Sequence, residues 1–256
     1  MSDNIGDFES KEAFEASPLA AKWREEQAAL RERMVREDVG WSRPVRLVAG
    51  LDVSADVEEP TRAVASCVIC EYPSMDVVHE VHHDVTFTQP YASGFLAFRE
   101  VDFLLDLLAE VRRERPDVVP DVCLVDGNGE LHVNGFGLAC HLGVRADIAT
   151  IGIGKKMHAV DGMGKETIAA DVMPELLAAK GKHSVMLTGA SGKTWAAAVR
   201  GDSSHNPVFV SIGHNVSLQS AVDIVLDTFK YRIPEPVRLA DLKSRDILRT
   251  RRKAST

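Results

Sequence analysis

Two aspartates lie in apolar segments that have the pattern of buried strands. The segment Asp-Val-Cys-Leu-Val-Asp126 ends in a carboxylate, and a glycine-rich stretch follows it directly. A short apolar run stopped by turn residues predicts a buried strand, and open α/β sheets carry their chemistry at such strand ends. A second segment, Arg-Leu-Val-Ala-Gly-Leu-Asp52-Val-Ser, places an aspartate inside the strand. Since burying an unpaired carboxylate costs several kcal/mol, we expect Asp52 to have a partner, and a metal ion is the favoured one.

Glu100 is a third carboxylate that could join the two aspartates. It lies beside the apolar stripe of a predicted helix, and the face turned toward the sheet would bring it to Asp52 and Asp126. Three converging carboxylates repel one another without a cation, and Mg²⁺ is the oxygen-preferring ion that suits them. The alternative is a solvated helix glutamate, and the pattern alone favours neither interpretation.

Three further polar residues have both a chemical and an ordinary structural interpretation. His214 lies between a predicted strand and a predicted helix, where a histidine beside a helix cap is the commoner arrangement. Lys155 follows a short strand and is either a phosphate contact or a surface lysine. Asp241 precedes a basic segment, where an aspartate more often caps a helix or joins a surface ion pair.

The elements that would position these residues alternate between strands and helices. The sequence predicts helices over 20–39, 94–115, 136–142 and 217–230. It predicts strands over 47–54, 62–71, 76–86, 149–153, 184–188, 195–199 and 207–211, and one that ends at 126. Three meandering strands followed by helical crossovers predict an α/β fold, a mixed sheet with helices packed on it.

Length and composition indicate one domain with a short segment outside it at each terminus. The 256 residues, 45% of them hydrophobic, can bury one substantial core, and no Pro-, Gly- or Ser-rich linker divides them. We expect a disordered acidic N-terminus over residues 1–18, a single domain over 19–248 and a basic tail over 249–256.

Composition also bounds the compartment and the partners. The chain has no apolar run of the roughly eighteen residues that a transmembrane helix needs, so we expect no membrane partner. Its acidic, polar start is unlike a signal peptide. The four cysteines lie in apolar surroundings and are expected to be reduced core residues of an intracellular protein, in the cytoplasm, the nucleus or both: Cys67, Cys70, Cys123 and Cys140.

The net charge of −8 does not decide whether the ligand is a nucleic acid. Residues 1–60 hold fourteen acids and eight bases, whereas residues 243–253 hold six bases and one acid. A basic segment suits phosphates, although a solvated basic terminus explains the same residues equally well.

Six segments between residues 45 and 245 match the motifs of one nuclease family, in the order of that family. They are Val-Ala-Gly-Leu-Asp52-Val-Ser, Pro-Tyr91-Ala-Ser-Gly-Phe-Leu-Ala-Phe-Arg-Glu100, Val-Asp126-Gly-Asn-Gly with Gly-Phe-Gly-Leu-Ala-Cys-His-Leu-Gly143, Ile-Gly-Ile-Gly-Lys155-Lys, Gly-His214-Asn-Val-Ser-Leu, and Tyr-Arg-Ile-Pro-Glu-Pro-Val-Arg-Leu-Ala-Asp241. On these motifs the chain resembles endonuclease V, whose members cut near deaminated purines. The segment Gly-Phe-Leu-Ala-Phe-Arg-Glu is closer to the eukaryotic members of the family, so the chain resembles an inosine-specific endoribonuclease. The resemblance implies a ribonuclease-H-like fold, in agreement with the predicted mixed sheet.

The resemblance also implies a role for each matching residue. The expected metal ligands are Asp52 and Asp126. The expected catalytic residues are Asp52, Glu100, Asp126, Lys155, His214 and Asp241. Tyr91 matches the wedge that fills the gap when the altered base leaves the stack. Residues whose backbone would approach that base are Gly94, Gly127, Gly129 and Gly137. One departure is His158, where relatives tend to carry an apolar residue near the base pocket.

The chemistry that the resemblance implies is hydrolysis of the phosphodiester bond 3′ to inosine. Mg²⁺ held by Asp52 and Asp126 would polarise the phosphate, Glu100 and His214 would position or deprotonate water, and Lys155 would add positive charge. The eukaryotic wording favours inosine in single-stranded RNA, with deoxyinosine-containing DNA as the alternative. We expect the protein to act as a monomer on RNA, DNA or both.

Two interpretations from other classes compete with a nuclease. A binding module that has lost catalysis is disfavoured, because clustered carboxylates beside a phosphate do not help binding. An amidohydrolase or phosphatase-like enzyme is disfavoured because the sequence has no Gly-x-Ser-x-Gly elbow, Walker loop or zinc-type histidine pair.

Overall fold

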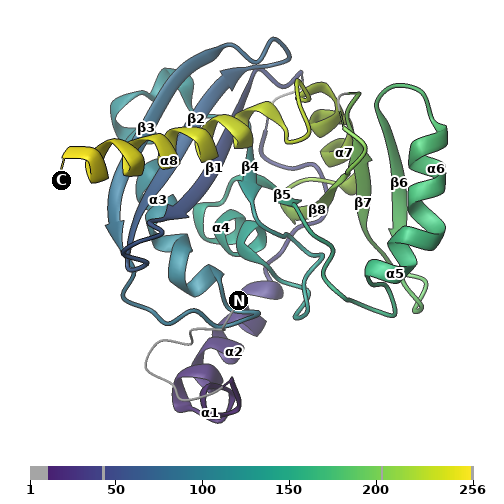
Figure 1. The fold of residues 1–256 in the computed structure, drawn as a ribbon, viewed down its shortest axis with the longest axis horizontal. Coiled ribbons are helices and arrows are strands. Elements are labelled where there is room, and N and C mark those ends of the chain that lie inside the picture. The colour runs from purple at the N-terminus through teal and green to yellow at the C-terminus, as the bar shows by residue number, and fades with distance from the viewer. Residues whose placement is uncertain (1–10, 42–43, 203, 255–256) are drawn as a thin grey trace.

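An eight-stranded mixed sheet forms the centre of the fold (Figure 1). The computed structural model describes residues 11–41, 44–202 and 204–254. The strand order is β3-β2-β1-β4-β5-β8-β7-β6. The strands are β1 (Leu47–Ala55), β2 (Arg62–Glu71), β3 (Val77–Thr86), β4 (Val122–Asp126), β5 (Ala149–Gly154), β6 (His183–Thr188), β7 (Thr194–Arg200) and β8 (Val208–His214). The antiparallel meander β1–β2–β3 followed by the parallel strands β4 and β5 confirms the predicted ribonuclease-H-like mixed sheet.

Helices flank this sheet. They are α1 (Lys11–Glu15), α2 (Pro18–Arg31), α3 (Ala97–Glu114), α4 (Leu138–Ala146), α5 (Lys165–Thr167), α6 (Met173–Ala178), α7 (Leu218–Asp227) and α8 (Glu235–Ala254), with a 3₁₀ turn η1 (Pro116–Val118) and a π turn η2 (Ile168–Val172). Within the described ranges, none of them has the length and hydropathy needed to span a bilayer.

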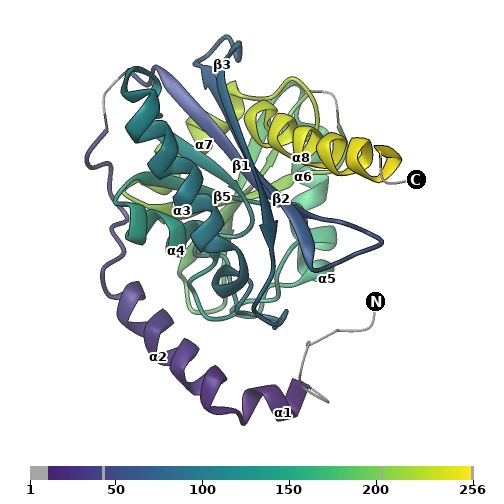
Figure 2. The same cartoon turned by 90° about the vertical axis from the view of Figure 1, so that its left-hand side faces the viewer.

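Alternate residues of the central strands face two different helix layers. Ala49 and Leu51 of β1 pack with α3 in one hydrophobic cluster, whereas Val48 packs with Val237 and Ala240 of α8 in another. Figure 2 shows α3 and α8 on opposite sides of β1 and β2. Because side chains alternate across a strand and both faces are covered, these strands are apolar along nearly their whole length.

The site lies where the C-terminal ends of three central strands meet, which is called the C-terminal edge of the sheet below. β1 pairs in parallel with β4, and β4 with β5, so the C-terminal ends of the three strands meet at the same edge. Asp126 is the last residue of β4 and lies opposite Ile153, two residues before Lys155. Open α/β sheets bind ligands at such an edge.

Helix α8 crosses β1 at a distance that only glycine permits. A β-carbon on Gly50 would lie 2.0 Å from the carbonyl carbon of Pro236. Pro236 stands in the first turn of α8, where a proline is accepted because its missing N–H would have no helical partner. This close crossing brings the following turns of α8 beside the C-terminal half of β1.

Several elements differ from their predictions. The helix predicted over 20–39 ends at Arg31, and the strand predicted over 207–211 continues to His214. The helical segment from Lys165 to Ala178 and the long helix α8 were not predicted, and α8 continues through the predicted basic tail to Ala254. The prediction of disorder over 1–18 falls partly on residues 1–10, outside the described part. From Lys11 onward the segment is helical, and Phe14 is buried.

Candidate functional site

Three aspartates from separate elements converge at the C-terminal edge of the parallel strands. Asp52 comes from β1, Asp126 from the end of β4 and Asp241 from α8. One carboxylate oxygen of each lies within 4.8 Å of the others. The structure thus brings together the two aspartates expected to bind a metal and adds Asp241, which was expected at the site but not among the ligands.

Asp52 is the most enclosed of the three. Its side chain is buried, and its Oδ2 accepts hydrogen bonds from Ser54 Oγ at 2.8 Å and from Ser244 Oγ at 3.0 Å. Burial, together with the neighbouring Asp126 carboxylate, raises the pKa of Asp52 from 3.8 to about 7. Without a cation the fully ionised cluster is therefore unfavourable, because desolvation and like charge both oppose it.

Lys155 places an ammonium group against the cluster. Its Nζ donates to Asp126 Oδ2 at 2.5 Å and to Asp241 Oδ1 at 3.4 Å. Burial lowers the pKa of Lys155, but the attraction of Asp126 and Asp241 outweighs burial, so the pKa is raised overall and the group stays charged. On its other side, Asp241 Oδ1 accepts a hydrogen bond from Arg245 Nη2 at 2.8 Å, one helical turn further along α8.

Glu100 approaches the cluster from the first turn of α3. The residue is half-buried. It is not part of the group of three aspartates whose oxygens lie within 4.8 Å of one another. Burial raises its pKa well above 4.5, and Asp52 and Asp126 raise it further. Glu100 therefore lies close enough for both aspartates to raise its pKa, but it is not one of the three clustered carboxylates.

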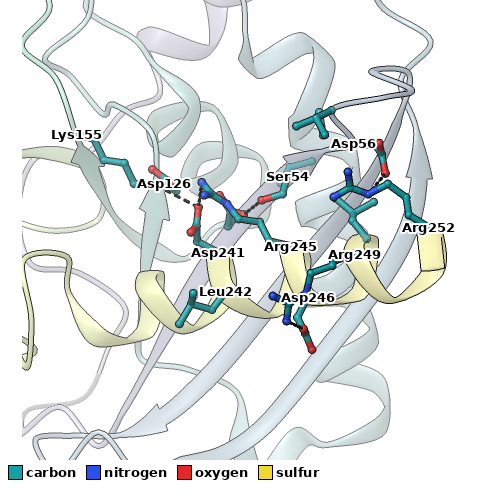
Figure 3. A pocket seen from close by; sticks show the side chains of 15 residues that line it. Ser54, Asp56, Asp126, Lys155, Asp241, Leu242, Arg245, Asp246, Arg249 and Arg252 are labelled. Atoms are coloured by element: carbon teal, nitrogen blue, oxygen red, sulfur yellow. Dashed lines mark hydrogen bonds and ion pairs between the residues drawn. The ribbon is translucent and has the colours of Figure 1, made fainter. Parts of the chain in front are cut away.

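The aspartate cluster opens into a cavity of about 740 Å³ between α8 and the turn from β1 to β2 (Figure 3). Arg245, Arg249 and Arg252 line this cavity from one side of α8. Arg249 donates to Asp246 Oδ1 at 2.5 Å, and Arg252 lies 3.6 Å from Asp56 Oδ2. Guanidinium groups beside an open cavity suit phosphate groups, which can replace carboxylate partners in the same bidentate geometry.

Tyr91 lies on the loop that leads into α3. The residue is 39% exposed. Gly94 in the same loop has φ +84°, a left-handed conformation that favours glycine. A β-carbon on Gly94 would lie 3.3 Å from Val133, so this loop packs against the segment that follows β4. The loop thus presents an exposed aromatic ring from a backbone that is closely packed on one side.

Two of the glycines expected to contact a base have other backbone segments directly against them. A β-carbon on Gly129 would lie 2.1 Å from the carbonyl oxygen of Ile212, and one on Gly137 would lie 2.3 Å from that of Asn128. Gly129 and Gly137 therefore allow one backbone segment to approach another, and their base contact stays a prediction. Gly127 directly follows Asp126 and has φ +157°.

The structure corrects the prediction for His214. This residue ends β8, which is antiparallel to β5, and it pairs with Thr150 near the start of β5, whereas Asp126 lies opposite Ile153 near its end. The His214 ring is buried, its Nδ1 accepts the N–H of Val35 at 3.1 Å, and its Nε2 lies 3.8 Å from an Asp147 oxygen. Burial lowers its pKa. His214 is an anchor at the opposite edge of the sheet and has no place in the aspartate cluster.

His158 lies on the loop after β5, three residues beyond Lys155. Its ring accepts a hydrogen bond from Asn128 Nδ2, 3.2 Å from Nε2, and its centroid lies 6.0 Å from that of His132. Burial lowers the pKa of His158, and it lowers the pKa of His132 to about 4. Two neutral, hydrogen-bonding rings therefore occupy the loops beside the site edge.

Sequence reasoning did not identify the residues that surround the aspartates. Ser54 and Ser244 hold Asp52, and Arg245 pairs with Asp241. Ser54 lies two residues after Asp52, on the same face of β1, and that spacing was a usable signal. Nothing in the sequence marks Ser244 or Arg245, because their role depends on where α8 crosses β1.

The arrangement can bind a hard divalent cation next to a basic wall. Carboxylate oxygens are the ligands that Mg²⁺ prefers, and three of them lie close together at an accessible sheet edge. Lysine and arginine groups around them suit an anionic substrate such as a phosphodiester. Metal-assisted hydrolysis of a phosphate ester is therefore the chemistry that these residues support best.

Comparison with known proteins gives one consistent result. The sequence model of the family described as endonuclease V matches residues 28–242. Human endonuclease V is 43% identical over 234 residues, which cover 89% of this chain and 82% of the human protein. The crystal structure of the catalytic domain of human endonuclease V has a TM-score of 0.86 at 40% identity and covers 91% of this chain and 96% of that one. Endonuclease V of Ciona intestinalis, solved with a 23mer DNA containing an inosine followed by a ribo-adenosine, has a TM-score of 0.85 at 33% identity and covers 92% and 99%.

The raised pKa of Asp52 predicts a pH dependence of stability in the metal-free protein. Between about pH 4 and pH 7 the folded state holds a proton that the unfolded state has released, so the free energy of unfolding falls as pH rises through this window. Asp52→Asn should remove much of that fall. Urea denaturation in the presence of a chelator, at several pH values between about 5 and 8, measures the effect.

Asp56→Asn is the matched control. Asp56 is also buried, but the backbone N–H of Glu58 lowers its pKa, so its contribution to stability is lost only as pH falls below about 4. Its replacement should leave the slope above pH 5 unchanged. An identical pH slope for wild type and Asp52→Asn would contradict the assigned state of Asp52.

Proposed function

This chain belongs to the endonuclease V family, and from that premise we propose that it is a divalent-metal-dependent endonuclease that hydrolyses the phosphodiester bond 3′ to inosine, with single-stranded RNA as its working substrate. The observation that carries the proposal is the cluster of Asp52, Asp126 and Asp241, with one oxygen of each within 4.8 Å of the others. We further propose that the chain from α1 to α8 acts as a single nuclease domain in an intracellular, monomeric protein, wider than the predicted 19–248 because Phe14 of α1 is buried and α8 continues to Ala254.

Mg²⁺ is the proposed cofactor, and the three aspartates are its proposed ligands. The raised pKa of Asp52 supports this assignment, because a cation would relieve the repulsion that opposes ionisation of the cluster. When bound, Mg²⁺ would polarise the phosphate and stabilise the charge on the leaving 3′ oxygen.

The side chains around the cluster have separate proposed roles. Lys155 binds Asp126 and Asp241 in the metal-free state, and its Nζ can turn to a phosphate oxygen once a metal takes these carboxylates. Glu100 is the proposed acceptor for the proton of the attacking water, because its partly buried carboxylate lies beside the aspartates and has a strongly raised pKa. Arg249 and its neighbours on α8 would hold the sugar-phosphate backbone along the cavity.

Inosine must leave the base stack before an enzyme can read it. Extrusion costs a few kcal/mol from a duplex and least from a weakly paired or single-stranded position. Tyr91 is the proposed wedge, because its exposed ring extends from the loop that leads directly to Glu100. Gly94 and Gly127 are the proposed points at which the backbone approaches the base.

The proposal of RNA as the substrate rests on the eukaryotic-type motif sequence and on the similarity to eukaryotic endonuclease V proteins. The Ciona intestinalis protein was solved with an inosine followed by a ribo-adenosine, which supports a substrate that carries a ribose after the inosine. Deoxyinosine-containing DNA is the second candidate, since that strand is otherwise DNA.

A cleavage panel tests the proposed function. Single-stranded RNA, single-stranded DNA and duplexes, each with inosine or adenosine at one position, are incubated with the protein and Mg²⁺. We expect cleavage 3′ to inosine, fastest on single-stranded RNA. Asp126→Asn should lower the rate at least roughly a hundredfold while binding survives, because the metal is lost but a negative charge beside the phosphate is also removed.

Each result of the panel has a definite meaning. Cleavage of adenosine strands at the same rate would contradict inosine specificity. Binding without cleavage at any Mg²⁺ or Mn²⁺ concentration would favour a binding module, and faster cleavage of deoxyinosine strands would favour DNA.

A second prediction concerns Tyr91. Stacking on a base contributes about 1–3 kcal/mol, or roughly tenfold to more than a hundredfold in affinity. Tyr91→Ala should weaken binding and slow cleavage, with a larger loss on an inosine duplex than on a single strand, because only the duplex leaves a gap to fill. Tyr72→Ala is the control, since Tyr72 pairs with Asp227 and its N–H donates to Arg46, at the other end of β1. Equal losses on both substrates would exclude the wedge role.

A further inference from the structure

The N-terminal helices pack against the loop that carries Tyr91. Phe14 of α1 and Trp23 of α2 form an aromatic cluster with Phe95 and Phe98, and Trp23 stacks on Phe98 with centroids 4.9 Å apart. Figure 2 shows α1 and α2 as an arm along the outside of the body. The two helices thus pack against the loop from Pro90 to Leu96 through this aromatic cluster.

Gln27 of α2 is the polar centre of this contact. Its Nε2 donates to the carbonyl oxygen of Phe136 at 2.8 Å and to that of Gly94 at 3.3 Å. Its Oε1 accepts a hydrogen bond from Asn134 Nδ2 at 2.8 Å. Asn134 Nδ2 also donates to Gly94 at 3.3 Å, which closes the network.

A carboxamide is the group that this position requires. Two carbonyl oxygens need donors and one amide needs an acceptor, and a glutamine side chain offers two N–H donors and one acceptor oxygen. Gln27 is only 4% exposed, so water cannot easily replace it. Losing the carboxamide would leave the carbonyl oxygen of Phe136 without this buried donor.

The network joins the two loops on which base recognition depends. Gly94 lies three residues after Tyr91, in a left-handed conformation that fixes the course of that loop. Asn134 and Phe136 belong to the segment that begins at Asp126 and passes through Gly127. A change at Gln27 would therefore move the wedge relative to the glycine beside the catalytic aspartate.

We propose that Gln27 is a positioning residue that fixes the Tyr91 loop against the segment following Asp126, and so sets how the protein holds a base that has left the stack. The inference rests on the proposed function, because it assigns Gln27 to the same site. It differs from a purely structural role, in which Gln27 would only anchor α2 and its loss would lower activity on every substrate alike.

Gln27→Met tests this assignment, because methionine keeps the length of the side chain and removes its hydrogen bonds. On an inosine duplex we expect kcat/KM to fall roughly tenfold, because the carbonyl oxygens of Phe136 and Gly94 lose the donor that Gln27 supplies. The fall should be clearly smaller on an inosine single strand, and the Mg²⁺ concentration for half-maximal rate should not change. Fluorescence of a 2-aminopurine next to the inosine should report reduced extrusion.

Asn134→Ala provides a second route if Gln27→Met does not fold. Asn134 is exposed, so its replacement should leave the core intact while removing one partner of Gln27 and one of Gly94. It should shift the duplex-to-single-strand ratio in the same direction, and less than additively with Gln27→Met. Gln219→Met, at an exposed glutamine on α7 that pairs with Asp223, is the matched control and should leave the duplex-to-single-strand ratio unchanged.

The outcomes separate the two proposals. If wild type cleaves inosine strands and both variants keep its duplex-to-single-strand ratio, the role of Gln27 is refuted while the proposed function stands. Equal losses on all substrates, accompanied by a lower melting temperature, would also refute it and leave Gln27 as a structural anchor. If wild type cleaves no inosine strand, both proposals fail.

Discussion

The structure depends on the concentration of negative charge at one edge of the sheet. Asp52, Asp126 and Asp241 hold their carboxylates within 4.8 Å of one another, and Asp52 is buried. Such a cluster opposes folding in the absence of a cation, because both burial and repulsion disfavour the ionised form. A protein that keeps this arrangement accepts a local loss of stability, which is the pattern expected of a binding or catalytic site.

The surrounding elements follow from the need to assemble this cluster. Parallel strands β1 and β4 bring their C-terminal ends to one edge, and α8 reaches that edge only because Gly50 allows it to cross β1. The hydroxyl groups of Ser54 and Ser244 then orient Asp52, and Lys155 provides a partial counter-charge. The arginines of α8 extend positive charge away from the cluster along the cavity. Negative charge at the strand ends and positive charge along the cavity thus lie side by side, as a site for a cation and an anionic substrate requires.

The sequence predicted the elements whose hydrophobic pattern is strong and local. The apolar segments that carry Asp52 and Asp126 have strand periodicity and turn residues at their ends, and the structure brings both residues to one edge. The helix with Glu100 has a clear apolar stripe for the same reason. Helix α8 was missed because the proline in its first turn and its basic residues resemble a tail, although its buried residues face the sheet.

What the sequence could not supply was the register and direction of distant pairings. His214 ends a strand, as Asp126 does, but β8 runs antiparallel to β5 and carries it to the opposite edge. Gly129 and Gly137 stand in a glycine-rich stretch that suggested ligand contact, yet their close neighbours are Ile212 and Asn128, one of them far along the chain. Gln27 is one of many polar residues on an amphipathic helix, and its hydrogen bonds to two distant loops are visible only in the structure.

The most direct test of this account is an anomalous diffraction map from crystals of the protein soaked in Mn²⁺, which binds oxygen ligands as Mg²⁺ does. The account predicts an anomalous peak within coordination distance of Asp52, Asp126 and Asp241, with Lys155 moved away from Asp126. An empty cluster at saturating Mn²⁺, or an ion bound elsewhere with Lys155 still on Asp126, would contradict the claim that these aspartates form a metal site.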